Sequence, residues 1–372
     1  MDLIAWAIVM GTGVWAGGAG NAGQFLDLGV GETVQITDLP CIQKSPSLSG
    51  DIVVWVDERS GAPEIYGYNL RTRQEFPVDT GGQPKGYPQI HGSVVAWPEK
   101  SAGYGVGYAA KDLATGQRYL LESGMGGYIG SSYLSVVGRK VFYTIYDSMR
   151  DEQGIYCRDL DTGVRTKVSG PGDYRYEPDA DEQWVVWAGT DGKLHLKNRA
   201  TGVIQTIANP SGGGVGEPVL GDGCVYFTAG YGTTSSKRIE RYDIATGQFT
   251  VVSGESFRRV THPSADGSIA IWTDYASMPA KSIEAFDASS GQRFNVVDLP
   301  EGGVLFSQQS FEIDGLRVAW TRTNAEYNRM DVFVTELIPE PATLGLLAVG
   351  ALALISRRKR STRRIGSAVC NG

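Results

Sequence analysis

The chain has 372 residues, and its 41% hydrophobic and 10% aromatic content predicts a packed globular body rather than a disordered one. Glycine is the unusual residue, because 50 glycines are nearly twice the average share of about 7%. Residues 23–338 hold 28 basic and 39 acidic residues, a net charge of −11, which excludes a general attraction for nucleic-acid backbones.

The first segment is predicted to be a helical signal peptide, residues 1–22. Leu3 to Trp15 form a largely apolar run, and the small residues from Ala16 to Ala22 offer a cleavage site. Only Met1 and Asp2 precede that run, whereas export signals usually begin with basic residues. Either a basic leader precedes this start or the signal is weak.

The body, residues 23–337, repeats one pattern seven times. A turn, usually with glycine, precedes an apolar run that ends in an aromatic residue, first in Gly50–Trp55. The later copies are Gly92–Trp97, Gly138–Tyr143, Glu182–Trp187, Gly221–Phe227, Gly267–Trp272 and Gly315–Trp320. Successive aromatic ends are 42, 46, 44, 40, 45 and 48 residues apart, and units of this length with several short strands are typical of β-propeller blades.

Each aromatic run has further predicted strands around it. A short segment that often contains proline precedes it, as at Ser45–Gly50 and Glu177–Asp181, and a strand, a turn and a closing strand follow. The turns have the form Asp/Asn-x-x-Thr/Ser-Gly and begin at Asp112, Asp159, Asn198, Asp243 and Asp287, with a degenerate copy at Asn69. The first side chain can cap its own backbone and the glycine can take a positive φ, so these acids are predicted to be turn formers rather than metal ligands.

The seventh repeat lacks a fourth strand. Its strands are predicted at Phe311–Ile313, Arg317–Arg322 and Asp331–Leu337, while Gly31–Thr37 is a strand with no blade before it. We therefore expect the N-terminal strand to complete the last blade and close the ring. Whether Phe25–Leu28 also pairs there stays open. The predicted fold is an all-β, seven-bladed propeller of four-stranded blades.

The C-terminal segment is predicted to be a membrane anchor. Ala342 to Ser356 are uncharged and largely apolar, and a basic stop of Arg357, Arg358, Lys359 and Arg360 follows. Basic residues stay on the cytoplasmic side, so a C-terminal transmembrane helix would place the body outside the cytoplasmic membrane.

Pro339, Glu340 and Pro341, the apolar run and the basic cluster together resemble the PEP-CTERM sorting domain. This resemblance assigns residues 338–364 to sorting and anchoring and residues 365–372 to a tail longer than the family usually has. It implies processing near the Pro-Glu-Pro by an exosortase, a transpeptidase-like membrane enzyme, and then release or transfer to the cell surface. The wording of Gly50–Leu70 resembles TolB-type propeller repeats, which implies a fold and no activity.

Few residues suggest a catalytic, metal-binding or disulfide-forming role. The histidines His91, His195 and His262 have no metal-ligand spacing, no GxSxG nucleophile elbow occurs, and we expect neither a metal nor a cofactor. Cys41, Cys157, Cys224 and Cys370 fit no disulfide framework, which favours buried or free thiols.

Two sets of loop residues are candidates for binding or catalysis. Carboxylates follow the aromatic-ended strands and keep a glycosidase or lyase open: Asp57, Glu58, Asp147, Asp151, Asp191 and Asp274. Tyrosines expected at the surface offer ring faces for sugar or protein contacts: Tyr104, Tyr108, Tyr128, Tyr174, Tyr176 and Tyr231.

The leading hypothesis is an exported, non-enzymatic propeller at the cell surface or in the extracellular matrix. Its expected partners are an exosortase-type enzyme and an extracellular polysaccharide or surface protein. The alternatives are a secreted carbohydrate-active enzyme, either a polysaccharide lyase or a glycosidase, and a periplasmic scaffold similar to TolB. Carboxylates in the central channel would favour the enzyme, whereas a channel of small or apolar residues would exclude it.

Overall fold

The computed structural model describes residues 28–339 apart from several short segments. These gaps are 102–104, 126–133, 148–151, 171–176, 211, 232–236, 255–259, 275–281, 300–303, 306–310, 325 and 327. The predicted signal peptide, the C-terminal helix, Glu340, Pro341 and the basic stop lie outside the described residues. Within them, no helix is long and apolar enough to span a membrane.

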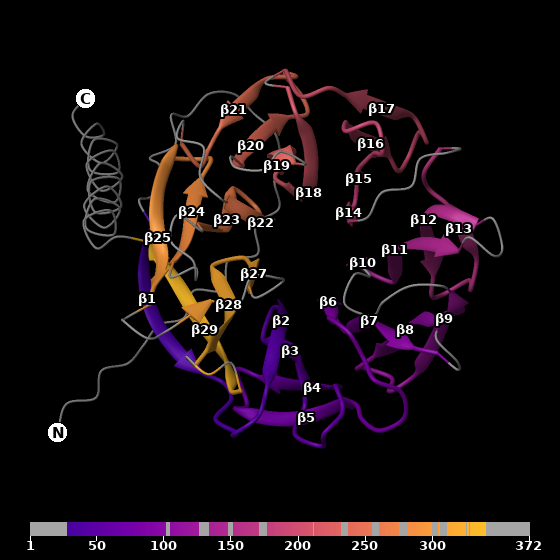
Figure 1. Cartoon of the computed structure of the whole chain (residues 1–372), viewed down its shortest axis with the longest axis vertical. Coiled ribbons are helices and arrows are strands. Elements are labelled where there is room, and N and C mark those ends of the chain that lie inside the picture. Colours follow the sequence, from indigo (N-terminus) through magenta and orange to yellow (C-terminus); the bar gives the residue numbers. More distant parts are fainter. Residues whose placement is uncertain are drawn as a thin grey trace, which may run out of the picture.

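The described strands form seven small antiparallel sheets around a central axis, which confirms the predicted seven-bladed propeller (Figure 1). Blades 1 and 2 contain β2 (Gln43–Ser49), β3 (Ile52–Asp57), β4 (Glu64–Asn69) and β5 (Gln74–Asp79), then β6 (Gln89–His91), β7 (Val94–Lys100), β8 (Val106–Asp112) and β9 (Arg118–Met125). Blades 3 and 4 contain β10 (Leu134–Val137), β11 (Lys140–Asp147), β12 (Glu152–Asp159) and β13 (Arg165–Lys167), then β14 (Asp179–Ala180), β15 (Trp184–Ala188), β16 (Leu194–Asn198) and β17 (Ile204–Ile207).

The remaining three blades follow the same order from the axis outward. Blades 5 and 6 contain β18 (Gly214–Gly221), β19 (Cys224–Tyr231), β20 (Arg238–Asp243) and β21 (Phe249–Val251), then β22 (Val260–Asp266), β23 (Ile269–Asp274), β24 (Ser282–Asp287) and β25 (Gln292–Asp298). Blade 7 contains β27 (Phe311–Asp314), β28 (Arg317–Thr323), β29 (Met330–Pro339) and β1 (Leu28–Gln35), and the short β26 (Val304–Leu305) also pairs with β28.

The aromatic-ended runs are the second strands of the blades, and they are apolar throughout because both faces of each sheet are covered. In β3, Val54 and Val56 pack with Ile90 and Trp97 of blade 2. The alternate residues Val53 and Trp55 pack with Ala319, Val332 and Val334 of blade 7. Since successive side chains of a strand point to opposite faces, one run serves two interfaces. The described core divides into seven such clusters, one between each pair of neighbouring blades.

The acidic residues of the repeated turns cap the backbone, as predicted. The carboxylate of Asp112 accepts a hydrogen bond from the Ala114 amide at 3.0 Å, and Asp159 accepts from the Thr162 amide at 3.0 Å. The glycines that end these two turns have φ of 74° at Gly116 and 69° at Gly163. The capped turn with a left-handed last residue is therefore the local structure that produces each outer hairpin.

The degenerate first turn predicts a stabilising substitution. Arg73 takes the glycine position with φ of 57°, and its amide still donates to the carbonyl of Asn69 at 2.8 Å. A left-handed conformation strains any residue with a Cβ, so Arg73→Gly is expected to raise the free energy of unfolding by about 0.5–1 kcal/mol. Thermal denaturation measures this change. Gly116→Ala, which puts a Cβ at the equivalent position of the next turn, should lower the free energy of unfolding by about 1 kcal/mol. A less stable Arg73→Gly variant would contradict it.

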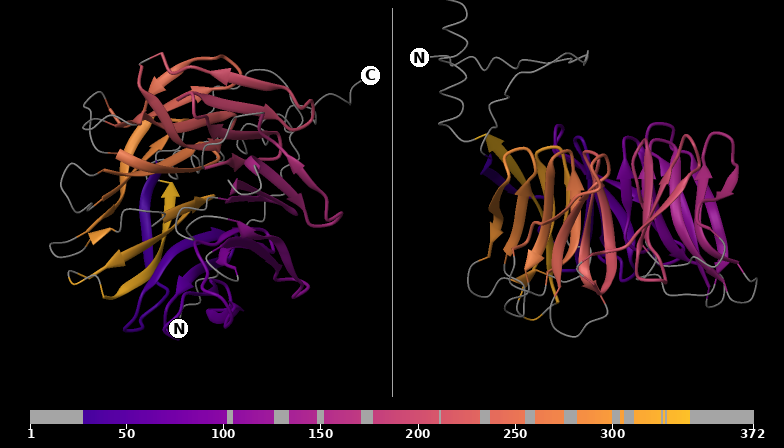
Figure 2. Two further views of the ribbon diagram at one scale, coloured as in Figure 1. Left: turned by 45° about the vertical axis from the view of Figure 1, so that its right-hand side comes forward. Right: turned by 90° about the horizontal axis from the view of Figure 1, so that it is seen from above.

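The N-terminal strand closes the ring, as predicted. β1 pairs with β29, with Val34 opposite Val334 and Gln35 opposite Phe333, and the hydroxyls of Thr33 and Thr335 lie 2.8 Å apart. In Figure 2 the first and last strands lie side by side at one edge of the ring. Blade 7 is thus built from both ends of the described chain.

The bounds of this closing pair differ from the predicted ones. β1 spans Leu28–Gln35 rather than Gly31–Thr37, and β29 continues past Leu337 to Pro339. The strands slip in register between Val30 and Thr33, where a Cβ on Gly31 would lie 3.0 Å from the Glu336 carbonyl oxygen. This bulge lets three further pairs form, so Leu28 does pair in the blade.

Candidate functional site in the central channel

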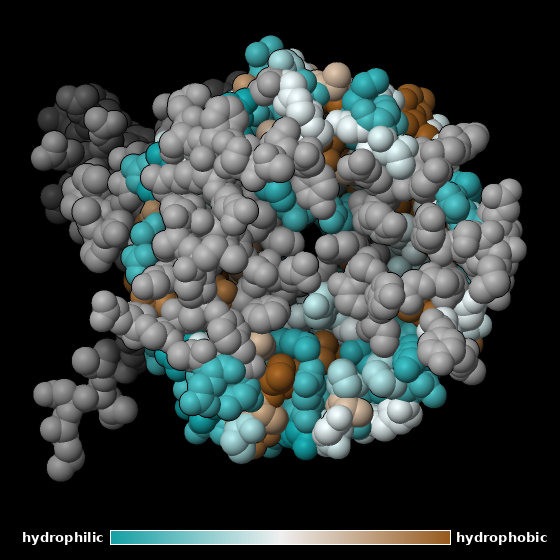
Figure 3. All heavy atoms as spheres, in the orientation of Figure 1, coloured by the Kyte–Doolittle hydropathy of each residue, from teal (hydrophilic) through white to brown (hydrophobic). Residues whose placement is uncertain are grey.

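The inner strands of the seven blades surround a cavity of about 180 Å³ at the centre of the ring. The space-filling view shows the ring hollowed at this point (Figure 3). Every blade contributes at least one lining residue, such as Ser45 of β2, Leu134 of β10 and Glu312 of β27. The cavity is therefore a product of ring closure and belongs to no single blade.

Proline recurs around the cavity, at Pro46, Pro88, Pro178, Pro218 and Pro263. Three residues that precede these prolines have positive φ, namely Ser45 at 55°, Glu177 at 78° and Glu217 at 53°. Residues before proline normally prefer extended conformations, so this backbone is strained. Register shifts between Lys44 and Ser47 and between Gly216 and Val219 mark the same places as bulges, which redirect side chains toward the axis.

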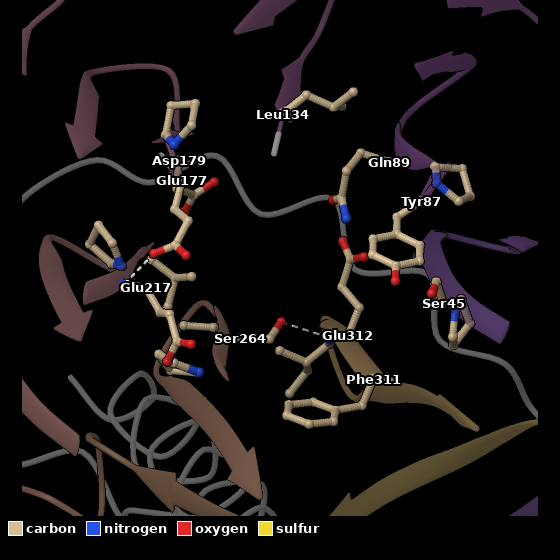
Figure 4. A pocket seen from close by; sticks show the side chains of 18 residues that line it. Ser45, Tyr87, Gln89, Leu134, Glu177, Asp179, Glu217, Ser264, Phe311 and Glu312 are labelled. Atoms are coloured by element: carbon tan, nitrogen blue, oxygen red, sulfur yellow. Dashed lines mark hydrogen bonds between the residues drawn. The ribbon is translucent and has the colours of Figure 1, made fainter. Parts of the chain in front are cut away.

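Four carboxyl groups converge on the cavity, those of Glu177, Asp179, Glu217 and Glu312. Figure 4 shows Glu177, Asp179 and Glu217 on one side and Glu312 on the other. Neither lysine nor arginine occurs among the residues described as lining it.

The Glu177 carboxylate connects two neighbouring blades, and the Glu217 carboxylate connects the first two strands of blade 5. The backbone amide of Glu217 donates to Oε2 of Glu177 at 2.6 Å, which joins blade 5 to blade 4. Oε2 of Glu217 accepts a hydrogen bond from the Thr228 hydroxyl at 2.7 Å, and this glutamate is 8% exposed. Both carboxylates are thus positioned by hydrogen bonds from the protein itself.

The Asp179 carboxylate connects three blades. It accepts hydrogen bonds from the Leu220 amide of blade 5 at 2.8 Å and from the Ser135 hydroxyl of blade 3 at 2.9 Å. Burial raises the pKa of Asp179 to about 6, although these hydrogen bonds act to lower it. The group therefore titrates between mildly acidic and neutral pH.

The Glu312 carboxyl is the most perturbed group in the channel. Burial, together with the nearby Asp179 and Asp314 carboxylates, raises its pKa to about 8, although hydrogen bonds to Ser47 and Gln89 act to lower it. The Ser47 hydroxyl also accepts a hydrogen bond from the Ile90 amide at 3.1 Å. Glu312 is therefore mostly a neutral acid at pH 7, and its contacts run from blade 7 through blade 1 to blade 2.

Of the carboxylates predicted as candidates, the three whose side chains are described, Asp57, Glu58 and Asp191, do not line this cavity. Asp57 is fully buried and accepts hydrogen bonds from the indole of Trp55 at 3.0 Å and from Arg59 at 2.7 Å. Glu58 pairs with Lys44 at 2.6 Å, and Asp191 lies 3.1 Å from His195. These four contacts lie within blades 1 and 4. Asp151 and the side chains of Asp147 and Asp274 lie outside the described residues.

Of the six tyrosines predicted to lie at the surface, only Tyr108 has a described side chain. Tyr108 is 2% exposed and donates to the Thr144 carbonyl at 2.9 Å, so its predicted place at the surface is wrong, because it packs between blades 2 and 3. Tyr104, Tyr128, Tyr174, Tyr176 and the side chain of Tyr231 lie outside the described residues.

Neither of the two histidines whose side chains are described, His91 and His195, lines the channel. Nδ1 of His91 accepts the Gly138 amide of the next blade at 3.0 Å, and the imidazole of His195 stacks on Trp187 with 5.5 Å between ring centroids. The side chain of His262 is outside the described residues. Across the described part of the chain, no group of three His, Cys, Asp or Glu could hold a metal ion. Cys41, Cys157 and Cys224 are free, as predicted.

The channel carboxyls were not predicted, although a signal was present. Glu177 and Glu217 both stand in Glu-Pro dipeptides, within the short proline-containing segments that precede the aromatic-ended runs. The same position in successive repeats faces the same axis, so repeat alignment alone could have placed these two side chains in the channel.

One family model matches the chain. The PEP-CTERM protein-sorting motif covers residues 337–360, which include Pro339, Glu340 and Pro341. The chain carries a PEP-CTERM sorting motif. The motif occupies only this end and leaves the activity of the propeller open. No curated protein matches the chain.

Solved structures similar to the body include a lyase, a domain of a protease and a putative TolB. An oligogalacturonate lyase from Vibrio parahaemolyticus is 12% identical with a TM-score of 0.61, covering 85% of this chain and 97% of that one. The β-propeller domain of the trilobed protease from Pyrococcus furiosus is 10% identical with a TM-score of 0.61, covering 80% and 95%. A putative TolB from Agrobacterium tumefaciens is 14% identical with a TM-score of 0.45, covering 82% and 93%. At these identities the likeness concerns the fold alone.

Proposed function

We propose that the protein is an exported, non-enzymatic binding module, displayed at the cell surface or in the extracellular matrix, whose central channel binds a polar group of an extracellular polymer. The observation that carries this proposal is the convergence of four held carboxyl groups on one cavity in a chain with a sorting motif. In this proposal residues 1–22 direct export. The segment around Pro339, Glu340 and Pro341 directs sorting, and the basic cluster Arg357–Arg360 stops transfer in the membrane.

The size of the cavity limits the ligand. A volume of about 180 Å³ corresponds to roughly six water molecules. One sugar residue or the end of one side chain is of a size that suits this space. We therefore propose that a chain end or a branch enters the channel.

The lining chemistry suits a hydroxylated group. Ionised carboxylates accept hydrogen bonds from hydroxyls, and the protonated carboxyl of Glu312 can donate one. Tyr87 and Phe311 add aromatic rings to the lining of the cavity that Glu312 also lines (Figure 4). Aromatic faces next to carboxyl groups are material for sugar recognition.

Binding can be tested with Glu177→Gln. The amide oxygen of glutamine can still accept the Glu217 amide, so the blades stay joined while the charge is lost. Calorimetry with polysaccharide from the producing bacterium is expected to show affinity at least about tenfold weaker than that of the natural protein. Glu182→Gln is the matched control, because its side chain is 81% exposed in the same blade. Equal affinity for Glu177→Gln and the natural protein would exclude the channel as the binding site.

A second candidate is a carbohydrate-active enzyme, either a lyase or a glycosidase. The observation that favours it is the neutral acid Glu312 in a cavity with other carboxyl groups, because such enzymes use a general acid of raised pKa. A screen of the same polysaccharide for shortened or unsaturated products decides between the two. Product release that is lost in Glu312→Gln would replace the binding proposal with this one.

A further inference from the structure

The sorting motif overlaps the propeller. The family model begins at residue 337, and β29 continues to Pro339. Three residues of the motif, Leu337, Ile338 and Pro339, are paired with Val30, Gly29 and Leu28 of β1. The first proline of the Pro-Glu-Pro sequence is therefore also the last residue of the last blade.

The first residue of the overlap, Leu337, is held in the hydrophobic core of the propeller. Leu337 is 2% exposed within the core cluster of blades 6 and 7, and its amide donates to the Leu316 carbonyl at 2.7 Å. Leu28 packs against the same cluster from β1. After Leu337 the chain is less tightly packed, because the next residue, Ile338, is 42% exposed. The end of the β1–β29 ladder is thus the part that can open without unfolding the blade.

We infer that closure of the ring gates the sorting motif: an enzyme that engages Pro339 must first separate the Leu28–Pro339 end of β1 from β29. A processing enzyme binds a short stretch of backbone on both sides of its motif, and here one side is occupied by β1. The apparent rate of processing then falls by the fraction of molecules in which this end is open. The proposal concerns access to the motif and stands whatever ligand the channel binds.

The first test moves the motif away from the ring. Insertion of Gly-Ser-Gly-Ser between Ile338 and Pro339 leaves Leu337 in the core and frees Pro339 from Leu28. Pulse-chase labelling of the full chain in the producing bacterium, followed by mass spectrometry of its C-terminus, is expected to show processing roughly 5–20-fold faster than in the natural chain. An unchanged or slower rate overturns the inference.

The second test loosens the same end by substitution. Leu28→Ser removes the side chain that packs near the motif, and we expect processing to accelerate severalfold. Val34→Ser is the matched control, because Val34 lies on the same strand, opposite Val334, with 43% exposure. Hydrogen exchange at the Ile338 amide should accelerate with Leu28→Ser and not with Val34→Ser. If both substitutions accelerate processing equally, general destabilisation explains the effect and the gate is wrong.

Discussion

Replacing β1, Leu28–Gln35, by a Gly/Ser linker of equal length is expected to lower the free energy of unfolding by about 4 kcal/mol or more. The linker removes the β1–β29 ladder, the Thr33–Thr335 contact and the cover over the outer edge of blade 7. Each lost backbone hydrogen bond contributes roughly 0.5–1.5 kcal/mol, and β29 becomes an open strand edge. Thermal unfolding should then begin at blade 7.

A permuted chain provides the control for this prediction. Leu28 is paired with Pro339, so a short turn can join residue 339 directly to residue 28 and make β1 the last strand of the chain. In this variant β29 and β1 become consecutive strands of one hairpin, and the contacts between them are kept. Its free energy of unfolding should therefore match that of the natural protein rather than that of the linker variant. If the linker variant unfolds at the temperature of the natural protein, β1 does not fasten the ring.

The second large effect is expected for Glu312→Gln at alkaline pH. The folded pKa of Glu312 is about 8, above the ordinary value of 4.5, so the folded state binds the proton more tightly than the unfolded chain. Stability of the natural protein therefore falls as the pH rises from about 4.5 through 8. Glutamine cannot ionise, so the variant is expected to be more stable than the natural protein at pH 9, by up to about 4 kcal/mol.

The pH profile distinguishes this effect from simple repacking. The two proteins should differ little near pH 4.5 and diverge as the pH approaches 9, in chemical denaturation at each pH. Asp179, with a pKa of about 6, adds a smaller loss of the same sign in both proteins between about pH 4 and 6. Glu182→Gln should show the pH profile of the natural protein. A difference between Glu312→Gln and the natural protein that does not change with pH would contradict the prediction.

The blades can be predicted from local sequence because each is specified by interactions between residues that are close together in the chain. The apolar run from Val53 to Val56 requires cover on both faces, and the Asp112 turn caps itself within a few residues. Such features repeat every 40 to 48 residues, which is sufficient to predict seven blades and N-terminal closure. The exact bounds of β1 were beyond prediction, because a bulge between Val30 and Thr33 shifts the pairing.

The sequence by itself therefore determined the repeat, the ring and the sorting motif at Pro339, Glu340 and Pro341, since these depend on local patterns or a contiguous motif. Only the tertiary structure decided which carboxyl groups share the channel, because Glu177, Asp179, Glu217 and Glu312 come from three different blades. It also decided that Asp57 is a buried partner of Trp55 and that Pro339 lies opposite Leu28. The physical reason is that the shared channel and the Leu28–Pro339 pair exist only after the ring has closed, whereas Asp57 contacts Trp55 within one strand and is buried by the packing of its blade.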